Sequence, residues 1–154
     1  VYSLVSLHTD SFLFWRWRQL NFRDFEIVTA TQGYGVLHKN ENMDGKPIIV
    51  RGNLYSSGLA THAQSNILIR MKSNKKFFSG TCGYPDNAFG AEVKCEIFSQ
   101  NRLIFVSNPL NNENREQRFL ISLDGISELL LVVTSLKPDI TAAHAVWVNL
   151  ESRN

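Results

Sequence analysis

Apolar and polar residues alternate in short runs along most of the chain, as they do in β-strands with one buried face. The clearest run is Val93–Phe98, in which Val, Cys and Ile alternate with Lys and Glu. The predicted strands cover residues 27–30, 47–50, 67–69, 76–82, 93–98, 103–106, 118–123, 129–134 and 145–150. Turn-forming residues separate them, and no run keeps a helical period over ten residues. This pattern predicts an all-β sandwich or barrel.

One stretch, Gly52–Ile69, connects a turn to a strand through an unusually polar segment. Gly52-Asn53 tolerates the positive φ angles that a tight hairpin requires. The Ser, Thr, His, Gln and Asn side chains that follow can contact a neutral polar ligand. They can equally bond to nearby backbone and hold a buried corner between two strands. The residues themselves leave both interpretations open.

Length and composition fit one ordinary globular domain of 154 residues, with 44% hydrophobic and 19% charged residues. The net charge of +2 is too mild to imply nucleic acid as a partner, because nucleic-acid-binding domains usually carry a clustered basic face. No apolar run of 18 residues exists, so no segment is predicted to span a bilayer. Because the chain starts at Val1 rather than Met, we expect a mature form or part of a larger polypeptide.

Residues 1–25 differ from the rest, because Phe12–Arg18 sets aromatic side chains beside arginines. Such a mixture is typical of a segment that flanks a membrane, where it would follow an upstream span. It also fits an edge strand with one aromatic in the core and the arginines in water, which we favour. We therefore predict an N-terminal extension or edge segment over residues 1–25 and a β-sandwich domain over residues 26–154.

Cys82 and Cys95 are the only cysteines, and they lie in successive predicted strands. If these strands pair as a hairpin, both thiols face the same core. A disulfide requires Cα atoms within about 7 Å. The alternative is a pair of reduced, buried thiols that act as small hydrophobes, and the sequence leaves both open.

Five segments carry motifs that belong together. Tyr55–Ile67 has the form Tyr-x-x-Gly-Leu-Ala-Thr-His-Ala-x-Ser-x-Ile, and Gly33–Gly35 is an aromatic residue between two glycines. The others are Met43–Ile48, Cys82–Asp86 and Ile140–Trp147. From about residue 26 to the end, they resemble the NPCBM domain, also classed as carbohydrate-binding module family 51. The first 25 residues show no such resemblance.

The resemblance implies a jelly-roll β-sandwich similar to galactose-binding domains. It also implies an accessory module of a larger glycan-active or cell-surface protein, located outside the cell, that recognises galactose-containing glycans. Bound calcium is a recurring structural feature of such sandwiches. There are departures: Tyr34 replaces the family's Trp, and Ala143 and Val146 replace two Asp residues, while Asn149 stands where another Asp is common. These losses remove acceptors for sugar hydroxyls or a cation.

Sugar recognition requires a flat aromatic face and planar polar groups. The candidate ligand-binding residues are Tyr34, His62, Gln64, Asp86, Asn87, His144 and Trp147. Each has a structural alternative: the histidines can bond to backbone, the Asp-Asn pair can form an ordinary turn, and the Trp can fill the core. Asp44 and Glu151 are the candidate calcium ligands, since calcium takes oxygen donors and a closed sandwich can bring these carboxylates together.

Catalysis is not predicted. Nothing pairs Asp86 with Glu92 as glycoside hydrolysis would require, and the four histidines are scattered along the chain. The sequence therefore predicts a non-catalytic module that binds a glycan. The alternative is a domain of the same fold that has lost its sugar site and serves structural or protein contacts, for instance within a membrane-attached protein.

Overall fold

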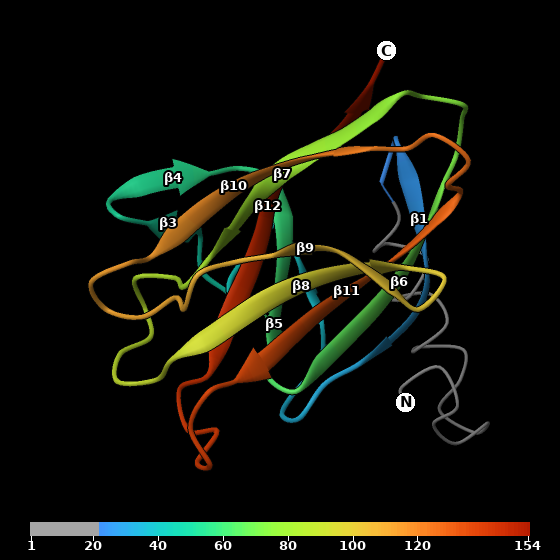
Figure 1. The fold of residues 1–154 in the computed structure, drawn as a ribbon. Coiled ribbons are helices and arrows are strands. Elements are labelled where there is room, and N and C mark those ends of the chain that lie inside the picture. Colours follow the sequence, from blue (N-terminus) through green and yellow to red (C-terminus); the bar gives the residue numbers. More distant parts are fainter. Residues whose placement is uncertain (1–21) are drawn as a thin grey trace, which may run out of the picture.

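The computed structural model describes residues 22–154, which form two antiparallel five-stranded sheets packed face to face (Figure 1). The first sheet has the order β1 (Phe25–Thr31), β6 (Ser65–Met71), β11 (Glu128–Ser135), β8 (Val93–Ser99) and β9 (Arg102–Val106). The second has the order β10 (Glu116–Ser122), β7 (Phe77–Gly83), β12 (His144–Arg153), β5 (Gly58–His62) and β2 (His38–Lys39). A two-stranded ribbon consists of β3 (Ile48–Val50) and β4 (Asn53–Tyr55). The jelly-roll β-sandwich is confirmed.

The main core lies between the two sheets and follows the alternation seen in the sequence. In β8, Val93, Cys95 and Ile97 are fully buried, while the residues between them are partly exposed. The second sheet contributes Leu59 and Trp147 to the same cluster. The strands expected from alternation therefore form because one face of each sheet is removed from water.

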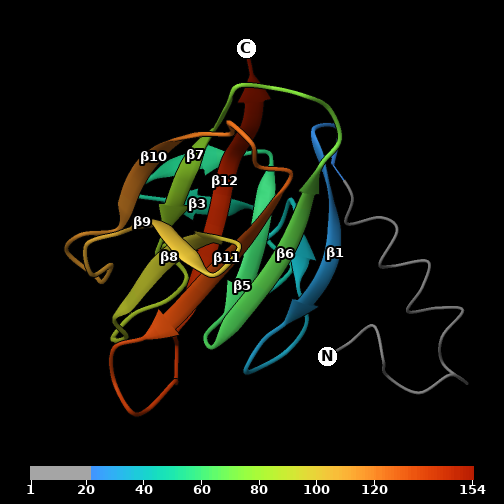
Figure 2. The same ribbon diagram turned by 45° about the vertical axis from the view of Figure 1, so that its right-hand side comes forward.

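A second, smaller core lies under the β3–β4 ribbon, which packs on the outer face of the second sheet (Figure 2). Ile48 and Val50 from the ribbon contact Ala60, Val146 and Val148 from β5 and β12. All five side chains are essentially inaccessible to solvent. As a result, the first half of β12 is buried on both faces and shows no polar alternation.

Residues 22–25, which precede the predicted boundary at residue 26, pack on the sandwich. Phe25 is fully buried, and its ring stacks on that of Phe22 with centroids 4.8 Å apart. The Asp24 carboxylate accepts a hydrogen bond from the Ser152 amide at 3.0 Å. The two interpretations of Phe12–Arg18 lie outside the described residues. Within residues 22–154, no helix is long and apolar enough to cross a membrane.

The two cysteine-bearing strands do not pair as a hairpin. Strand β7 lies between β10 and β12, whereas β8 lies between β11 and β9 in the opposite sheet. Cys82 and Cys95 are nevertheless both fully buried, as free thiols facing the shared core. Burial, reinforced by the adjacent Cys82 thiol, raises the pKa of Cys95 well above its usual value.

The predicted turn at Gly52-Asn53 is shifted by one residue. The β3–β4 hairpin turns at Arg51-Gly52, with φ angles of 51° and 77°. Two successive positive φ angles match the right-handed twist of a two-residue hairpin, and Gly supplies the second at no steric cost.

Candidate functional site

Three ring side chains gather at one end of the second sheet. His62 ends β5 and His144 begins β12, and the two are direct partners in the antiparallel register. Their ring centroids lie 5.3 Å apart, and the Tyr34 ring lies 5.5 Å from that of His62. Tyr34 is 69% exposed, whereas His62 is only 4% exposed. We call Tyr34, His62 and His144 the ring row.

The loop that carries Tyr34 is fixed to β5 by Gly33 and Gln32. A Cβ at Gly33 would overlap the backbone of Ala63, so only glycine permits this close approach. The Gln32 side chain donates to the Tyr34 carbonyl at 2.7 Å and accepts from the Thr61 hydroxyl at 2.9 Å. Sequence reasoning missed Gln32, and its place beside a glycine turn was the only available signal.

The two histidines of the ring row use their nitrogens differently. His62 Nδ1 lies 2.8 Å from the Ala63 carbonyl, which it contacts as a donor. His144 Nδ1 is buried, and it has no hydrogen-bond partner among the described residues. Burial lowers the pKa of His144, as does nearby His62, while Asp44 opposes the shift. Because Nδ1 is buried, only the rest of the partly exposed His144 ring is open to a ligand, beside the exposed Tyr34 ring.

Two loops from distant parts of the chain meet beside His144. Asp44, between β2 and β3, is close enough to influence the pKa of His144. Its Oδ2 accepts a hydrogen bond from Asn87 Nδ2 at 2.9 Å, and its backbone amide donates to Asn42 Oδ1, also at 2.9 Å. The structure therefore brings Asn87 to the neighbourhood of the ring row, with its amide nitrogen already used by Asp44.

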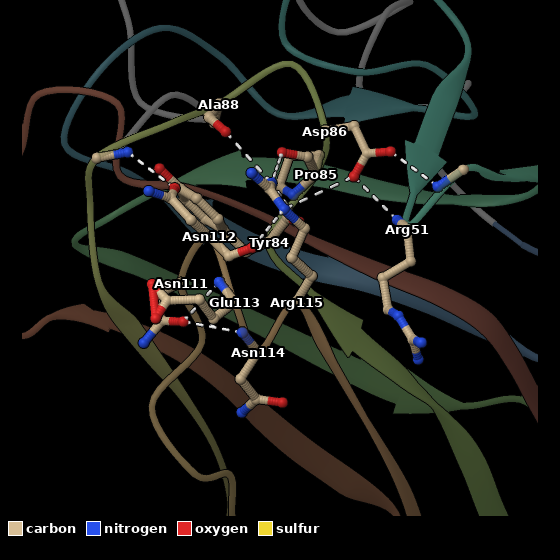
Figure 3. Close-up of polar contacts among 12 residues, drawn as sticks. Arg51, Tyr84, Pro85, Asp86, Ala88, Asn111, Asn112, Glu113, Asn114 and Arg115 are labelled. Atoms are coloured by element: carbon tan, nitrogen blue, oxygen red, sulfur yellow. Dashed lines mark hydrogen bonds and ion pairs between the residues drawn. The ribbon is translucent and has the colours of Figure 1, made fainter.

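Gln64 and Asp86 use their oxygens within the protein. Gln64 Oε1 accepts a hydrogen bond from the Ser135 amide at 2.8 Å. The two carboxylate oxygens of Asp86 accept from the amides of Arg51 and Gly52 at 2.9 and 2.8 Å (Figure 3). Asp86 therefore has a structural role, because it holds the hairpin turn between β3 and β4.

The structure contradicts the assignment of Trp147 to the ligand site. Its side chain has no exposed surface, and its ring meets that of Phe119 edge-on with centroids 6.0 Å apart. Both faces of β12 are buried here, so Trp147 points into the main core while Val146 and Val148 point into the smaller one. The ring cannot offer a face to a sugar.

Asp44 and Glu151 do not form one calcium site. Asp44 is close enough to His144, at the start of β12, to influence the pKa of that histidine, whereas Glu151 is seven residues further along the strand (144 to 151), about 23 Å when extended. The Glu151 carboxylate instead lies 3.9 Å from Arg153. In the described part of the chain, no group of three or more His, Cys, Asp or Glu residues could hold a metal ion. The predicted pair does not supply the six to eight oxygens that calcium takes.

Arg115 organises the loop that follows β7, and sequence reasoning missed it. Its Nη1 lies 3.3, 2.8 and 3.3 Å from the carbonyl oxygens of Tyr84, Pro85 and Ala88 (Figure 3). Its Nε donates to the Asn112 carbonyl at 3.1 Å. One arginine thus ties two loops together, and a lone Arg before a strand carries no signal for such a role.

Comparison with known families agrees with this architecture. A model of the NPCBM/NEW2 domain matches residues 18–152. The chain belongs to the NPCBM/NEW2 domain family. The match begins eight residues before the predicted boundary (26 to 18), in line with the packing of Phe22 and Phe25 onto the sandwich.

Solved structures similar to this NPCBM/NEW2 domain are carbohydrate-binding modules. The CBM51 domain of Clostridium perfringens GH95, in complex with methyl-galactose, has a TM-score of 0.76 and 24% identity, covering 82% of this chain and 94% of that one. CBM51-2 of C. perfringens ZmpB, in complex with GlcNAc, has a TM-score of 0.75 and 20% identity, covering 84% of this chain and 30% of that one. The tandem CBM51 modules of Streptococcus pneumoniae Sp3GH98 have a TM-score of 0.71 and 18% identity, covering 88% of this chain and 49% of that one. The fold is that of a carbohydrate-binding module.

A similar curated protein is the alpha-1,3-galactosidase B of Akkermansia muciniphila, which is 25% identical over 129 residues. The alignment covers 80% of this chain and only 16% of the galactosidase. The NPCBM/NEW2 domain therefore corresponds to a small part of that enzyme. In C. perfringens ZmpB, two CBM51 domains likewise occur with an M60 catalytic domain.

Proposed function

We propose that this chain is a non-catalytic module that binds a galactose-containing glycan at the ring row. The observation that carries the proposal is the ring row itself: the Tyr34 ring is 69% exposed, and it lies in one cluster with His62 and the partly exposed His144 ring. An aromatic face packs against the C–H side of a sugar, and an imidazole bonds a hydroxyl. The methyl-galactose bound to a similar CBM51 domain makes galactose the first sugar to test.

We further propose that the domain is an accessory module of a larger glycan-active protein that acts outside the cell. Two observations support this: the similar galactosidase is much longer than the matched segment, and the CBM51 domains of ZmpB accompany a catalytic domain. The module brings its parent protein to a glycan and carries out no reaction itself. Calcium binding stays a prediction, and Asp44 and Glu151 give it no support as a pair.

The second candidate is a structural or protein-interaction domain that has lost sugar binding. One set of observations favours it: Gln64, Asp86 and Asn87 all use polar groups within the chain. In addition, Ala143 and Val146 replace expected carboxylates and are fully buried. Under this hypothesis the ring row has no ligand.

A glycan array of the isolated domain, run with calcium and with chelator, separates the two candidates. We expect binding to galactose-terminated glycans with a dissociation constant of about 0.01 to 1 mM, because a shallow site makes few hydrogen bonds of about 1 kcal/mol each. Tyr34→Ala should weaken binding of methyl galactoside about 2- to 10-fold, since one aromatic contact is lost. Isothermal titration measures this change.

Leu120→Ala is the matched control, because Leu120 is 58% exposed on β10 and lies outside the ring row. Both variants should melt at the temperature of the wild type, since each removes an exposed side chain. A blank array from a cooperatively melting domain would favour the interaction domain. Unchanged affinity in Tyr34→Ala would place the sugar elsewhere.

A further inference from the structure

The loop between β7 and β8 presents a large apolar side chain to water. Phe89 is 75% exposed, the highest value among the large hydrophobic residues of the described chain. The residue before it, Ala88, is 3% exposed and belongs to the main core. The loop is therefore anchored in the protein directly before it exposes this ring. Binding residues concentrate on loops that a rigid scaffold holds in place.

The backbone is held on both sides of Phe89. The Ala88 carbonyl lies 3.3 Å from Arg115 Nη1, and the Gly90 amide donates to Asn112 Oδ1 at 3.0 Å (Figure 3). The Gly90 carbonyl accepts from Lys137 Nζ at 2.8 Å. Three contacts from two separate segments, residues 112–115 and Lys137, thus fix the two neighbours of Phe89. A ring on a fixed backbone loses little conformational entropy on binding, which makes it an effective contact for a ligand.

The same loop is joined to the ring row. Asn87, two residues before Phe89, donates to Asp44, which influences the pKa of His144. The Tyr84 hydroxyl donates to the Ala142 carbonyl at 3.0 Å, two residues before His144. Chain connectivity keeps the Cα of Phe89 within about 7 Å of that of Asn87. Phe89 therefore lies at the end of the sandwich that carries the ring row.

We propose that Phe89 forms a second sugar subsite, which contacts the ring next to the galactose held by the ring row. This inference rests on the proposed function and specifies its ligand: an oligosaccharide of at least two rings rather than a monosaccharide. Phenylalanine has no polar atom, so it contributes through the apolar C–H face of a sugar and not through hydroxyls. The polar groups of the ring row then discriminate among sugars by their hydroxyl groups.

The test compares methyl galactoside with a panel of galactose-terminated disaccharides, lactose among them, by isothermal titration. We expect the wild type to bind at least one disaccharide about 2- to 10-fold more tightly than methyl galactoside. In Phe89→Ala this gain should disappear, while affinity for methyl galactoside and the melting temperature stay unchanged. Phe89→Tyr, which keeps the ring, should keep the gain, and Leu120→Ala should behave as the wild type.

The outcomes are distinguishable. A wild type that binds methyl galactoside but gains nothing from a second ring overturns the subsite and leaves the proposed function standing. Equal weakening of both ligands in Phe89→Ala also overturns it, because Phe89 would then belong to the galactose site. A wild type that binds no sugar overturns both proposals.

Discussion

At the level of single residues, the ring row depends on side chains that need not touch a ligand. Gly33 lets the Tyr34 loop approach the backbone of Ala63, and Gln32 bonds both to that loop and to Thr61. These contacts place an exposed tyrosine beside a buried histidine. Because Gly33 lies outside the ring row, a substitution at Gly33 would move Tyr34 without replacing any side chain of the ring row.

Acid is expected to destabilise the fold through His144. Burial lowers the pKa of His144 from 6.5, so the folded chain keeps this imidazole neutral to a lower pH than the unfolded chain does. The unfolded state then binds more protons in this range. The stability contributed by the neutral imidazole is therefore complete above about pH 6.5 and is lost as pH falls through the folded-state pKa.

Thermal melts between about pH 7.5 and pH 5 test this expectation in wild type and His144→Gln. The melting temperature of the wild type should fall more steeply with acid than that of the variant, because glutamine does not titrate. Parallel curves for the two proteins would assign the acid sensitivity to another group.

At the level of elements, hydrophobic alternation predicted most strands but missed β2, β4 and β5, and it did not determine how the strands pair. Val93, Cys95 and Ile97 alternate with polar residues, so β8 was visible in the sequence. The partner of β7 was not visible, because strand pairing is decided by packing between segments far apart in the chain. Arg115 shows the same limit, since it acts on carbonyls 27 to 31 residues earlier. Contacts between an arginine side chain and backbone carbonyl groups leave no periodic pattern in the sequence, so the sequence does not reveal them.

Arg115→Met is expected to lower the free energy of unfolding by about 2 to 3 kcal/mol. The substitution removes charge-assisted hydrogen bonds and leaves the carbonyls of Tyr84, Pro85 and Ala88 without this donor. Arg118→Met is the matched control, because Arg118 is exposed three residues further along (115 to 118). It should change stability by less than about 0.5 kcal/mol. Urea unfolding measures both, and equal effects would show that the loop does not depend on Arg115.

At the level of the whole molecule, the main core and the smaller core share strand β12. Burial in these cores explains why Ala143 and Val146 replace the Asp residues that the family usually carries. Val146 contacts the ribbon residues Ile48 and Val50, and Ala143 is fully buried in the main core. A carboxylate at either position would be desolvated without a paired charge, which is costly. Val146, Trp147 and Val148 are all apolar because both faces of β12 are buried here, so alternation cannot assign them to opposite faces. The sequence therefore did not show that Trp147 belongs to the main core.

The sandwich also determines the chemistry of its two thiols. Cys82 and Cys95 come from opposite sheets and are fully buried, and burial raises the pKa of Cys95. The thiolate is the nucleophile that attacks a thiol reagent, so a raised pKa and lack of access both slow the reaction. We expect negligible labelling by a chromogenic disulfide reagent at about pH 8 in the folded protein. In denaturant, both cysteines of the chain should react.

Labelling in the folded state should then report how often the two sheets separate, since neither thiol is reached without opening the main core. The core-loosening variant Gly80→Ala, whose new Cβ would lie 2.6 Å from Leu150 and 2.9 Å from Phe119, should speed labelling at both cysteines together. Rapid labelling of one cysteine in the folded wild type would contradict a closed core. Failure to label either cysteine in denaturant without reductant would show that the two thiols form a disulfide.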